Sequence, residues 1–245
     1  MKRFPMIAAL VVVLCAAGCS APPGSGPGVA VVKVDGQIQT EPQESMFGLE
    51  QGGADSIARK IRGYRKNENV KAIVLRVNSP GGTVAASQEI LEEVKKARKE
   101  GKKVVVSMAD LCASGGYYIA SHADRIYADP GTLTGSIGVY IGGVNATGLA
   151  KKIGIKVEII KSGAFKDILS PWRDMTDEER NLLQEAVTDI YDQFVAEVAT
   201  GRKMPEDKVR PLADGRIFTG RKAKEVGLVD EMGGLHDALL GAAKM

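Results

Sequence analysis

The sequence is poor in the residues on which several classes of protein depend. Aromatic residues make up only 5% of its 245 residues, too few for the stacking platforms that bind single-stranded nucleic acid. Lys and Arg number 33 against 30 Asp and Glu, a net charge of +3, which does not favour a nucleic-acid-binding protein. Two histidines and three cysteines offer few metal ligands. We therefore expect no nucleic-acid partner, no metal and no other cofactor.

A long hydrophobic run is also lacking, which excludes a multi-span membrane protein. The apolar stretch from Met6 to Ala17 has about twelve residues, whereas a membrane-spanning helix needs about 20. It follows two positive charges, Lys2 and Arg3, and this order is typical of a secretory signal peptide. Removal of residues 1–18 leaves 31 cations against 30 anions, a net charge of +1.

The end of this segment, Ala16-Ala17-Gly18-Cys19, resembles a bacterial lipobox, in which the cysteine becomes the lipidated first residue. A lipid on Cys19 would hold the chain at the outer face of a bacterial cell membrane, with residues 19–28 as a flexible tether rich in Pro, Gly and Ser. The alternative is an ordinary signal peptide cleaved near Cys19. In either case Cys112 has no partner for an internal disulfide.

Residues 29–245 alternate between predicted strands and predicted helices. Strands are expected at 29–34, 70–77, 103–108, 126–128 and 156–161, and helices at 56–64, 84–98, 113–121 and 144–153. This alternation predicts βαβ units and a mostly parallel sheet. A capping box at residues 176–179 then opens a long helix, and a shorter helix is expected at 220–226. With no repeat and no linker, one domain is expected.

Three segments that follow predicted strands are candidates for a site: residues 78–83, 112–120 and 161–173. In open α/β sheets, ligands bind at the carboxyl ends of the strands. Ser114 stands on a predicted strand-to-helix turn before two glycines, so its hydroxyl and the N–H of Gly115 would face the same space. The alternative is that Ser114 merely caps the helix.

The segment that ends in Gly81 and Gly82 is predicted to form a tight turn, because its proline restricts φ and its glycines permit another chain segment to approach the backbone closely. An N–H of Gly81 or Gly82 can then supply a second donor to an oxyanion. The segment is not a phosphate-binding loop, because it lacks the Gly-Lys-Ser/Thr ending.

A serine nucleophile needs a base, and neither histidine suits that role. His122 lies eight residues beyond Ser114, which is about 12 Å along a regular helix and outside hydrogen-bonding distance. His236 is expected at the surface. A Ser-His-Asp triad is therefore poorly supported.

The remaining candidate base is Lys166. A lysine base must lose its proton near neutral pH, whereas the ordinary lysine pKa is about 10.4. Apolar surroundings and the positive charges of Lys161 and Arg173 can favour the neutral amine. The alternative is that Lys166 pairs with Asp167 at the surface, and spacing does not decide between the two.

Taken together, these segments resemble the signal peptide peptidase A family, which comprises serine proteases of the crotonase and Clp-protease superfamily. The resemblance implies an α/β fold in which a parallel sheet is flanked by helices and followed by a C-terminal helical segment, with residues 29–245 as the peptidase domain. The matching stretches are residues 77–82, 113–120, 133–139, 161–167, 170–176 and 214–216.

The resemblance also implies the roles of single residues. Ser114 would be the nucleophile and Lys166 the general base, with Ser136 holding the amine of Lys166 in place. The oxyanion donors would be backbone N–H groups of Gly81 or Gly82 and of Gly115.

The function implied is that of an endopeptidase that hydrolyses hydrophobic peptides, such as cleaved signal peptides, at the membrane. Short members of the family assemble into rings, in which Lys166 can act on Ser114 of a neighbouring subunit. The family usually has an N-terminal transmembrane anchor, where this chain has the lipobox-like sequence. The alternatives are a sibling protease that trims membrane proteins, a crotonase-type acyl-thioester enzyme that binds coenzyme A, and a catalytically silent lipoprotein scaffold.

Overall fold

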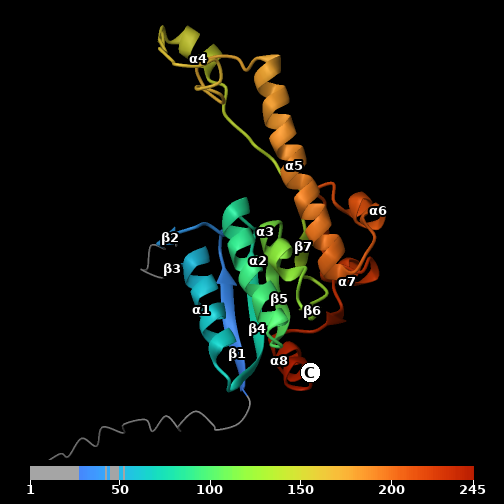
Figure 1. Ribbon diagram of the computed structural model, residues 1–245. Helices are drawn as coiled ribbons and strands as arrows, with labels where there is room; N and C mark the ends of the chain where they lie inside the picture. The colour runs from blue at the N-terminus through green and yellow to red at the C-terminus, as the bar shows by residue number, and fades with distance from the viewer. Residues whose placement is uncertain (1–27, 42, 45–49, 52) are drawn as a thin grey trace, which may run out of the picture.

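A computed structural model describes residues 28–41, 43–44, 50–51 and 53–245. The predicted signal peptide, the predicted lipidation site Cys19 and the tether up to residue 27 lie outside the described residues. Figure 1 shows a central sheet with helices against it and a long helix that leads away from it.

The described chain alternates strands and helices through most of its length. In chain order the elements are β1 (Gly28–Asp35), β2 (Gln43–Glu44), β3 (Glu50–Gln51), α1 (Ala54–Lys66), β4 (Val70–Ser79), α2 (Val84–Lys99), β5 (Lys103–Ala113), α3 (Gly115–Ala120), β6 (Arg125–Ala128), β7 (Leu133–Gly135), α4 (Thr147–Lys152), α5 (Asp177–Arg202), α6 (Glu206–Val209), the 3₁₀ helix η1 (Arg210–Leu212), β8 (Ile217–Thr219), α7 (Gly220–Glu225), β9 (Glu231–Met232) and α8 (Leu235–Ala243).

The central sheet is mostly parallel, as the sequence predicts. Its strand order is β1-β4-β5-β6-β9, with each pair parallel. β7 pairs with the far end of β5 in parallel, and β8 joins β7 as the antiparallel strand. The carboxyl ends of β5 and β7 therefore lie side by side, which places the segments that follow them at one edge.

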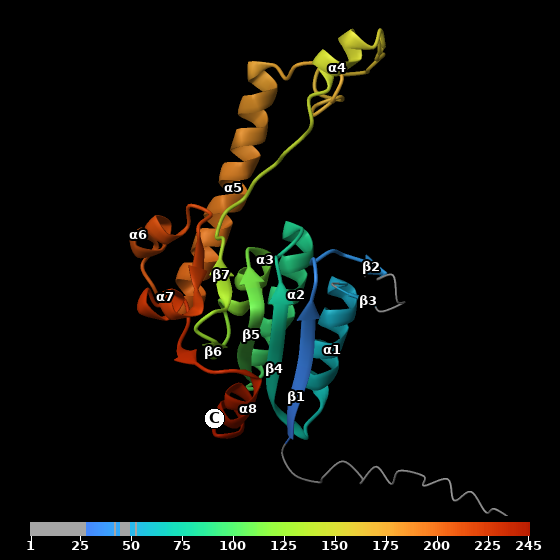
Figure 2. The ribbon, with the colours of Figure 1, turned by 180° about the vertical axis from the view of Figure 1, so that it is seen from behind.

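Both faces of the sheet are covered, because the side chains of β4 alternate between two cores. Ile73 and Leu75 belong to the larger core, which also contains apolar residues of α1, α2 and α3. Val74 belongs to a smaller core completed by Ala238 and Ala242 of α8. Figure 2 shows α8 near the sheet on the side away from α1 and α2. Coverage on both faces explains why the central strand β4 is apolar at most positions rather than alternating.

α5 is the element that extends beyond the sheet. It has 26 residues, which corresponds to about 39 Å of helix. Its C-terminal half packs on the body through Phe194, Val195 and Val198, whereas Leu182 and Ala186, which fall on the apolar face of its sequence pattern, are exposed. Residues 144–175, which we call the outlying segment, lie beyond the N-terminal end of α5 and contain α4 (Figures 1 and 2).

Several predicted boundaries need correction. β5 continues to Ala113 rather than ending at Met108, and the helix after it begins at Gly115. The strand expected at residues 156–161 is wrong, since the described chain has no strand between β7 and β8. A strand forms only with a partner for its backbone, and the outlying segment stands away from every strand of the sheet. None of the described helices is long and apolar enough to cross a membrane.

Substituting alanine for either of two helical glycines is expected to change the stability of the fold, in opposite directions at the two positions. A Cβ on Gly201 of α5 would collide with the carbonyl of Ser121, and it would lie 2.9 Å from the His122 ring. We expect Gly201→Ala to lower the free energy of unfolding by roughly 1–3 kcal/mol. Gly63 of α1 has open space around its Cβ position, so Gly63→Ala should raise the free energy of unfolding by roughly 0.5–1 kcal/mol. Urea unfolding of both variants checks this, and equal effects would contradict the packing of α5 on the Ser121 turn.

Candidate active site

Ser114 occupies a strained position between β5 and α3. Its backbone has φ 52° and ψ −122°, a region that costs a non-glycine residue about 1–3 kcal/mol. Two backbone hydrogen bonds stabilise the turn: Ser114 donates its N–H to Gly135 O at 2.9 Å, and its carbonyl oxygen accepts from the N–H of Tyr118 at 2.8 Å. Its side chain makes no capping hydrogen bond to α3. Ser114 thus stands at the N-cap position of α3 without capping the helix through its side chain, and its half-buried hydroxyl is left for another partner.

The turn after β4 lies directly against Ser114, and its glycines are required there. Gly81 has φ 95°, and a Cβ on it would lie 2.5 Å from Gly115 N and 2.8 Å from Ser114 Cβ. A Cβ on Gly82 would collide with the backbone of Ile38. Only glycine permits this approach of the two chain segments, so the predicted role of this turn in close packing is confirmed.

Two backbone N–H groups in this contact are free. Gly81 donates its N–H to Ser79 Oγ at 3.1 Å. The N–H groups of Gly82 and Gly115 have no acceptor among the residues that the structure describes. A Cβ on Gly115 would lie 3.2 Å from Gly82 N, so the two donors are neighbours. Of the two alternatives for the second oxyanion donor, the geometry thus favours Gly82, and Gly81 shapes the turn.

Ser136 lies beside Ser114. The sheet register pairs Ala113 of β5 with Gly135 of β7, so both serines are the first residues beyond adjacent parallel strands. Ser136 also has a positive φ, 50°, and donates its N–H to Arg216 O at 2.8 Å. The structure therefore brings together four of the residues named from the sequence: Ser114, Gly82, Gly115 and Ser136.

Neither histidine is available to Ser114. His122 lies beyond the end of α3 and is buried, with Nε2 2.6 Å from an oxygen of Glu197, which also accepts from Lys95 Nζ at 2.7 Å. Burial, more than any other influence, lowers the pKa of His122 below its ordinary value. This network joins α2, the turn after α3 and α5. His236 is exposed on α8, as predicted.

An apolar pocket opens next to Ser114. It has a volume of about 100 Å³ and lies between α2, α3, α5 and the chain after β7. The rings of Tyr118 and Phe194 meet edge to face within its wall, with centroids 5.0 Å apart. No residue of the wall carries a charge: it comprises Gly82, Val84, Ser87, Gln88, Ser114, Gly115, Tyr118, Gly138, Val139, Tyr140, Ile190, Gln193 and Phe194.

Sequence reasoning missed most of this pocket. Ile190 and Phe194 are four residues apart in α5 and were expected only as parts of a helix face. Val84 opens α2, and Val139 belongs to no regular element. No local motif marks Val84, Ile190 or Phe194, because their meeting depends on how α5 crosses α2 and α3.

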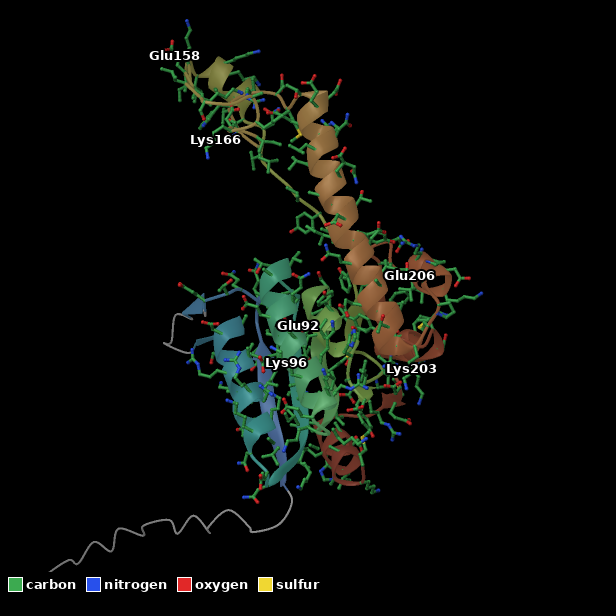
Figure 3. All side chains as sticks on the ribbon, viewed as in Figure 1. Glu92, Lys96, Glu158, Lys166, Lys203 and Glu206 are labelled. Carbon is green, nitrogen blue, oxygen red and sulfur yellow. The ribbon has the colours of Figure 1, made fainter. Side chains whose placement is uncertain are left out.

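Lys166 is the predicted site residue that the structure does not bring to the others. Figure 3 places it in the outlying segment, beside the N-terminal part of α5 and away from the sheet, whereas Ser114 lies between β5 and α3. Within the described residues its amine has no ion pair or hydrogen-bond partner. The alternative surface pair with Asp167 is not formed, because Asp167 accepts from Lys161 and Arg173.

A parallel sheet with a strained serine, two adjacent free N–H groups and an apolar pocket defines an α/β protein with a serine site of the hydrolase type. The fold has a solved counterpart, a serine-to-alanine mutant of the 1510-N membrane-bound stomatin-specific protease. The two align with a TM-score of 0.60 at 17% identity, over 89% of this chain and 85% of that one. This similarity confirms the predicted Clp-protease-like fold.

Sequence comparison gives the family. The profile described as Peptidase family S49 matches residues 96–245. An Enterococcus faecium protein named "Putative signal peptide peptidase SppA" is 40% identical over 211 residues, which cover 86% of this chain and 61% of that protein. Serine protease SPPA, chloroplastic, of Arabidopsis thaliana is 39% identical over 187 residues, which cover 76% of this chain and 28% of that protein. The chain belongs to peptidase family S49, a family of serine peptidases, and spans under two thirds of the length of these relatives.

Proposed function

We propose that the chain is a serine endopeptidase that uses Ser114 as nucleophile and Lys166 as general base to hydrolyse hydrophobic peptides. The observation that carries this proposal is the free hydroxyl of Ser114 on a strained turn, beside the unpaired N–H groups of Gly82 and Gly115 and at the mouth of an apolar pocket. These are the parts needed to attack a peptide carbonyl and to stabilise the oxyanion that forms.

The proposed reaction has two halves. Ser114 Oγ forms a bond to the scissile carbonyl carbon and gives its proton to Lys166 Nζ, while the carbonyl oxygen becomes an anion held by Gly82 and Gly115. The carbon–nitrogen bond then breaks, and the leaving amine takes the proton from Lys166. Water, deprotonated by Lys166, attacks the acyl-enzyme and releases the acid, and Ser114 regains its proton. Ser136 positions the amine of Lys166 beside Ser114.

The pocket supports a hydrophobic substrate. A charged side chain buried against Val84, Tyr118 and Phe194 would lose its hydration without gaining a partner, since no wall residue is charged. Cleaved signal peptides are apolar and fit this requirement, and one relative is named as a signal peptide peptidase. A second candidate is the trimming of membrane proteins, favoured by the name of the solved protease, which describes it as membrane-bound and stomatin-specific.

The proposed location is the outer face of a bacterial cell membrane. The support is in the sequence: the signal-peptide pattern of residues 1–18 and the lipobox-like residues that end at Cys19. A lipid at Cys19 would keep the pocket close to membrane-derived peptides.

We also propose that the active unit is a ring in which Lys166 serves Ser114 of a neighbouring copy. Two observations support a second copy as partner. Lys166 stands away from Ser114 of its own chain (Figure 3). The outlying segment also exposes large apolar side chains, among them Val144, Leu149 and Ile160, that a monomer would leave in water. Residues 156–161, which have the pattern of a strand, would find a backbone partner in such a contact.

A peptide panel tests the substrate class. We expect the purified protein to cleave fluorogenic peptides with Leu, Phe or Ala before the scissile bond at least tenfold faster than peptides with Asp or Lys there, an order-of-magnitude estimate. Val84→Glu should reduce cleavage of the apolar peptides about tenfold or more, because it places a carboxylate in the pocket wall.

Val31→Glu is the matched control for this test, since Val31 of β1 is 38% exposed and Val84 is 37% exposed. It lies outside the pocket and should leave the rates unchanged. Absence of hydrolysis of every peptide, together with binding of coenzyme A, would replace the peptidase proposal with the acyl-thioester alternative.

A further inference from the structure

The carboxylate of Asp167, the residue that follows Lys166, already has two cationic partners, Lys161 and Arg173. One oxygen of Asp167 lies 2.7 Å from Lys161 Nζ, and the two oxygens lie 2.7 Å from Nε and Nη2 of Arg173. The side chain of Asp167 is only 11% exposed, so these pairs are less screened than ordinary surface pairs. Lys166 is therefore next to Asp167 in sequence but does not pair with its carboxylate.

Arg173 also ties this part of the outlying segment to α5. Its guanidinium contacts both oxygens of Glu179, with Nη1 at 2.8 Å from one of them. Glu179 is 2% exposed and completes the capping box, accepting from the N–H of Thr176 at 2.9 Å. A continuous set of contacts thus runs from the first turn of α5 through Arg173 to Asp167, the neighbour of Lys166.

Both carboxylates in this network are ionised at neutral pH. Hydrogen bonds from Arg173, and then from Lys161, hold the pKa of Asp167 well below its ordinary value. Hydrogen bonds from Arg173 and from the backbone of Thr176 lower the pKa of Glu179 to about 2. The other carboxylate near Arg173 in sequence, that of Asp174, accepts from Asn145 Nδ2 at 2.7 Å. An Asp167 carboxylate that loses Arg173 would return toward the ordinary aspartate pKa of about 3.9, and it would still be negatively charged at the pH of catalysis.

A free carboxylate beside a lysine stabilises the ammonium form and opposes its use as a base. We propose that Arg173 is a positioning residue for the peptidase reaction: it binds Asp167 and Glu179 together, and so keeps the carboxylate of Asp167 away from the amine of Lys166. This inference rests on the proposed role of Lys166 as the base. It assigns Arg173 no contact with substrate.

The test is the pH dependence of kcat/KM on a fluorogenic apolar peptide, measured with the full chain. In Arg173→Gln the carboxylate of Asp167 loses its main partner and can turn to Lys166. We expect the pH at which kcat/KM reaches half of its maximum to move upward by about one unit. At pH values more than one unit below the wild-type midpoint this corresponds to about a tenfold loss of rate, which raising the pH should recover.

The double variant Arg173→Gln/Asp167→Asn separates this role from a merely structural one. Removing the released carboxylate should return the pH profile to its wild-type position, even if the loss of the Glu179 contact leaves a lower maximum. Arg180→Gln is the matched control, because Arg180 is an exposed arginine of α5 outside this network. It should leave the profile unchanged.

Two results overturn the inference in different ways. A wild-type profile for Arg173→Gln, or an upward shift that Asp167→Asn does not reverse, refutes the role of Arg173 while Lys166 stays the base. Full activity of Lys166→Ala, included in the same series, refutes the proposed base itself and the inference with it.

Discussion

Ser114→Ala is expected to lower kcat for peptide hydrolysis by at least about 10⁴-fold, because removal of a catalytic nucleophile abolishes the acyl-enzyme route. The fold should remain intact. Alanine at φ 52° is as strained as serine, and the hydroxyl of Ser114 makes no capping bond whose loss would destabilise α3. The measurements are the initial rate on a fluorogenic apolar peptide and the melting temperature.

A fluorophosphonate probe gives an independent measurement of the same prediction. The probe should label the wild-type chain on Ser114 and leave Ser114→Ala unlabelled. Ser56→Ala, in the first turn of α1 and half-buried like Ser114, is the matched control and should keep both activity and labelling. Hydrolysis by Ser114→Ala at near the wild-type rate would refute the assignment of the nucleophile.

Mixing two inactive variants is expected to restore activity. Ser114→Ala keeps a working Lys166, and Lys166→Ala keeps a working Ser114. Each is inactive by itself, because every site in its assembly lacks one of the two groups. When the two are co-assembled in equal amounts at random, about a quarter of the contacts in a ring join an intact Ser114 to an intact Lys166. We therefore expect the mixture to recover about a quarter of the wild-type rate.

Two controls make this result decisive. The double variant Ser114→Ala/Lys166→Ala has neither group, so its mixture with either single variant should stay inactive. The oligomer size of every mixture, measured by light scattering, should match that of the wild type. Inactive mixtures of normal size would show that Lys166 does not act across subunits, and the outlying segment would then have to fold back onto its own Ser114.

Much of the architecture follows from local sequence. The strands predicted at residues 29–34 and 70–77, and the helix between them, lie within one or two residues of their predicted bounds. Such segments can be recognised because β4 is buried on both faces and so is apolar at most positions, and because a helix against a sheet needs one apolar face. The capping box at residues 176–179 likewise forms from residues three apart.

The wrong strand and the points that the sequence left undecided have a common physical cause, namely dependence on a distant partner. Residues 156–161 have the composition of a strand, but hydrogen bonding to a second strand is what makes one, and none lies alongside. The choice between Gly81 and Gly82 as donor depended on Ser79, whose hydroxyl accepts from Gly81. His122 was judged by its distance along a helix that ends before it, and the partner it finds is Glu197 of α5.

Local pattern alone determined that this chain is an α/β protein with a parallel sheet, and that Ser114 stands on a turn at a strand end. Tertiary structure decided which groups meet there: the free N–H groups of Gly82 and Gly115, the neighbouring residue Ser136 and the apolar wall supplied in part by α5. It also decided that Lys166 stands apart from them. Periodicity records which face of an element is buried, whereas the meeting of groups up to a hundred residues apart depends on how the elements cross, and no single segment carries that information.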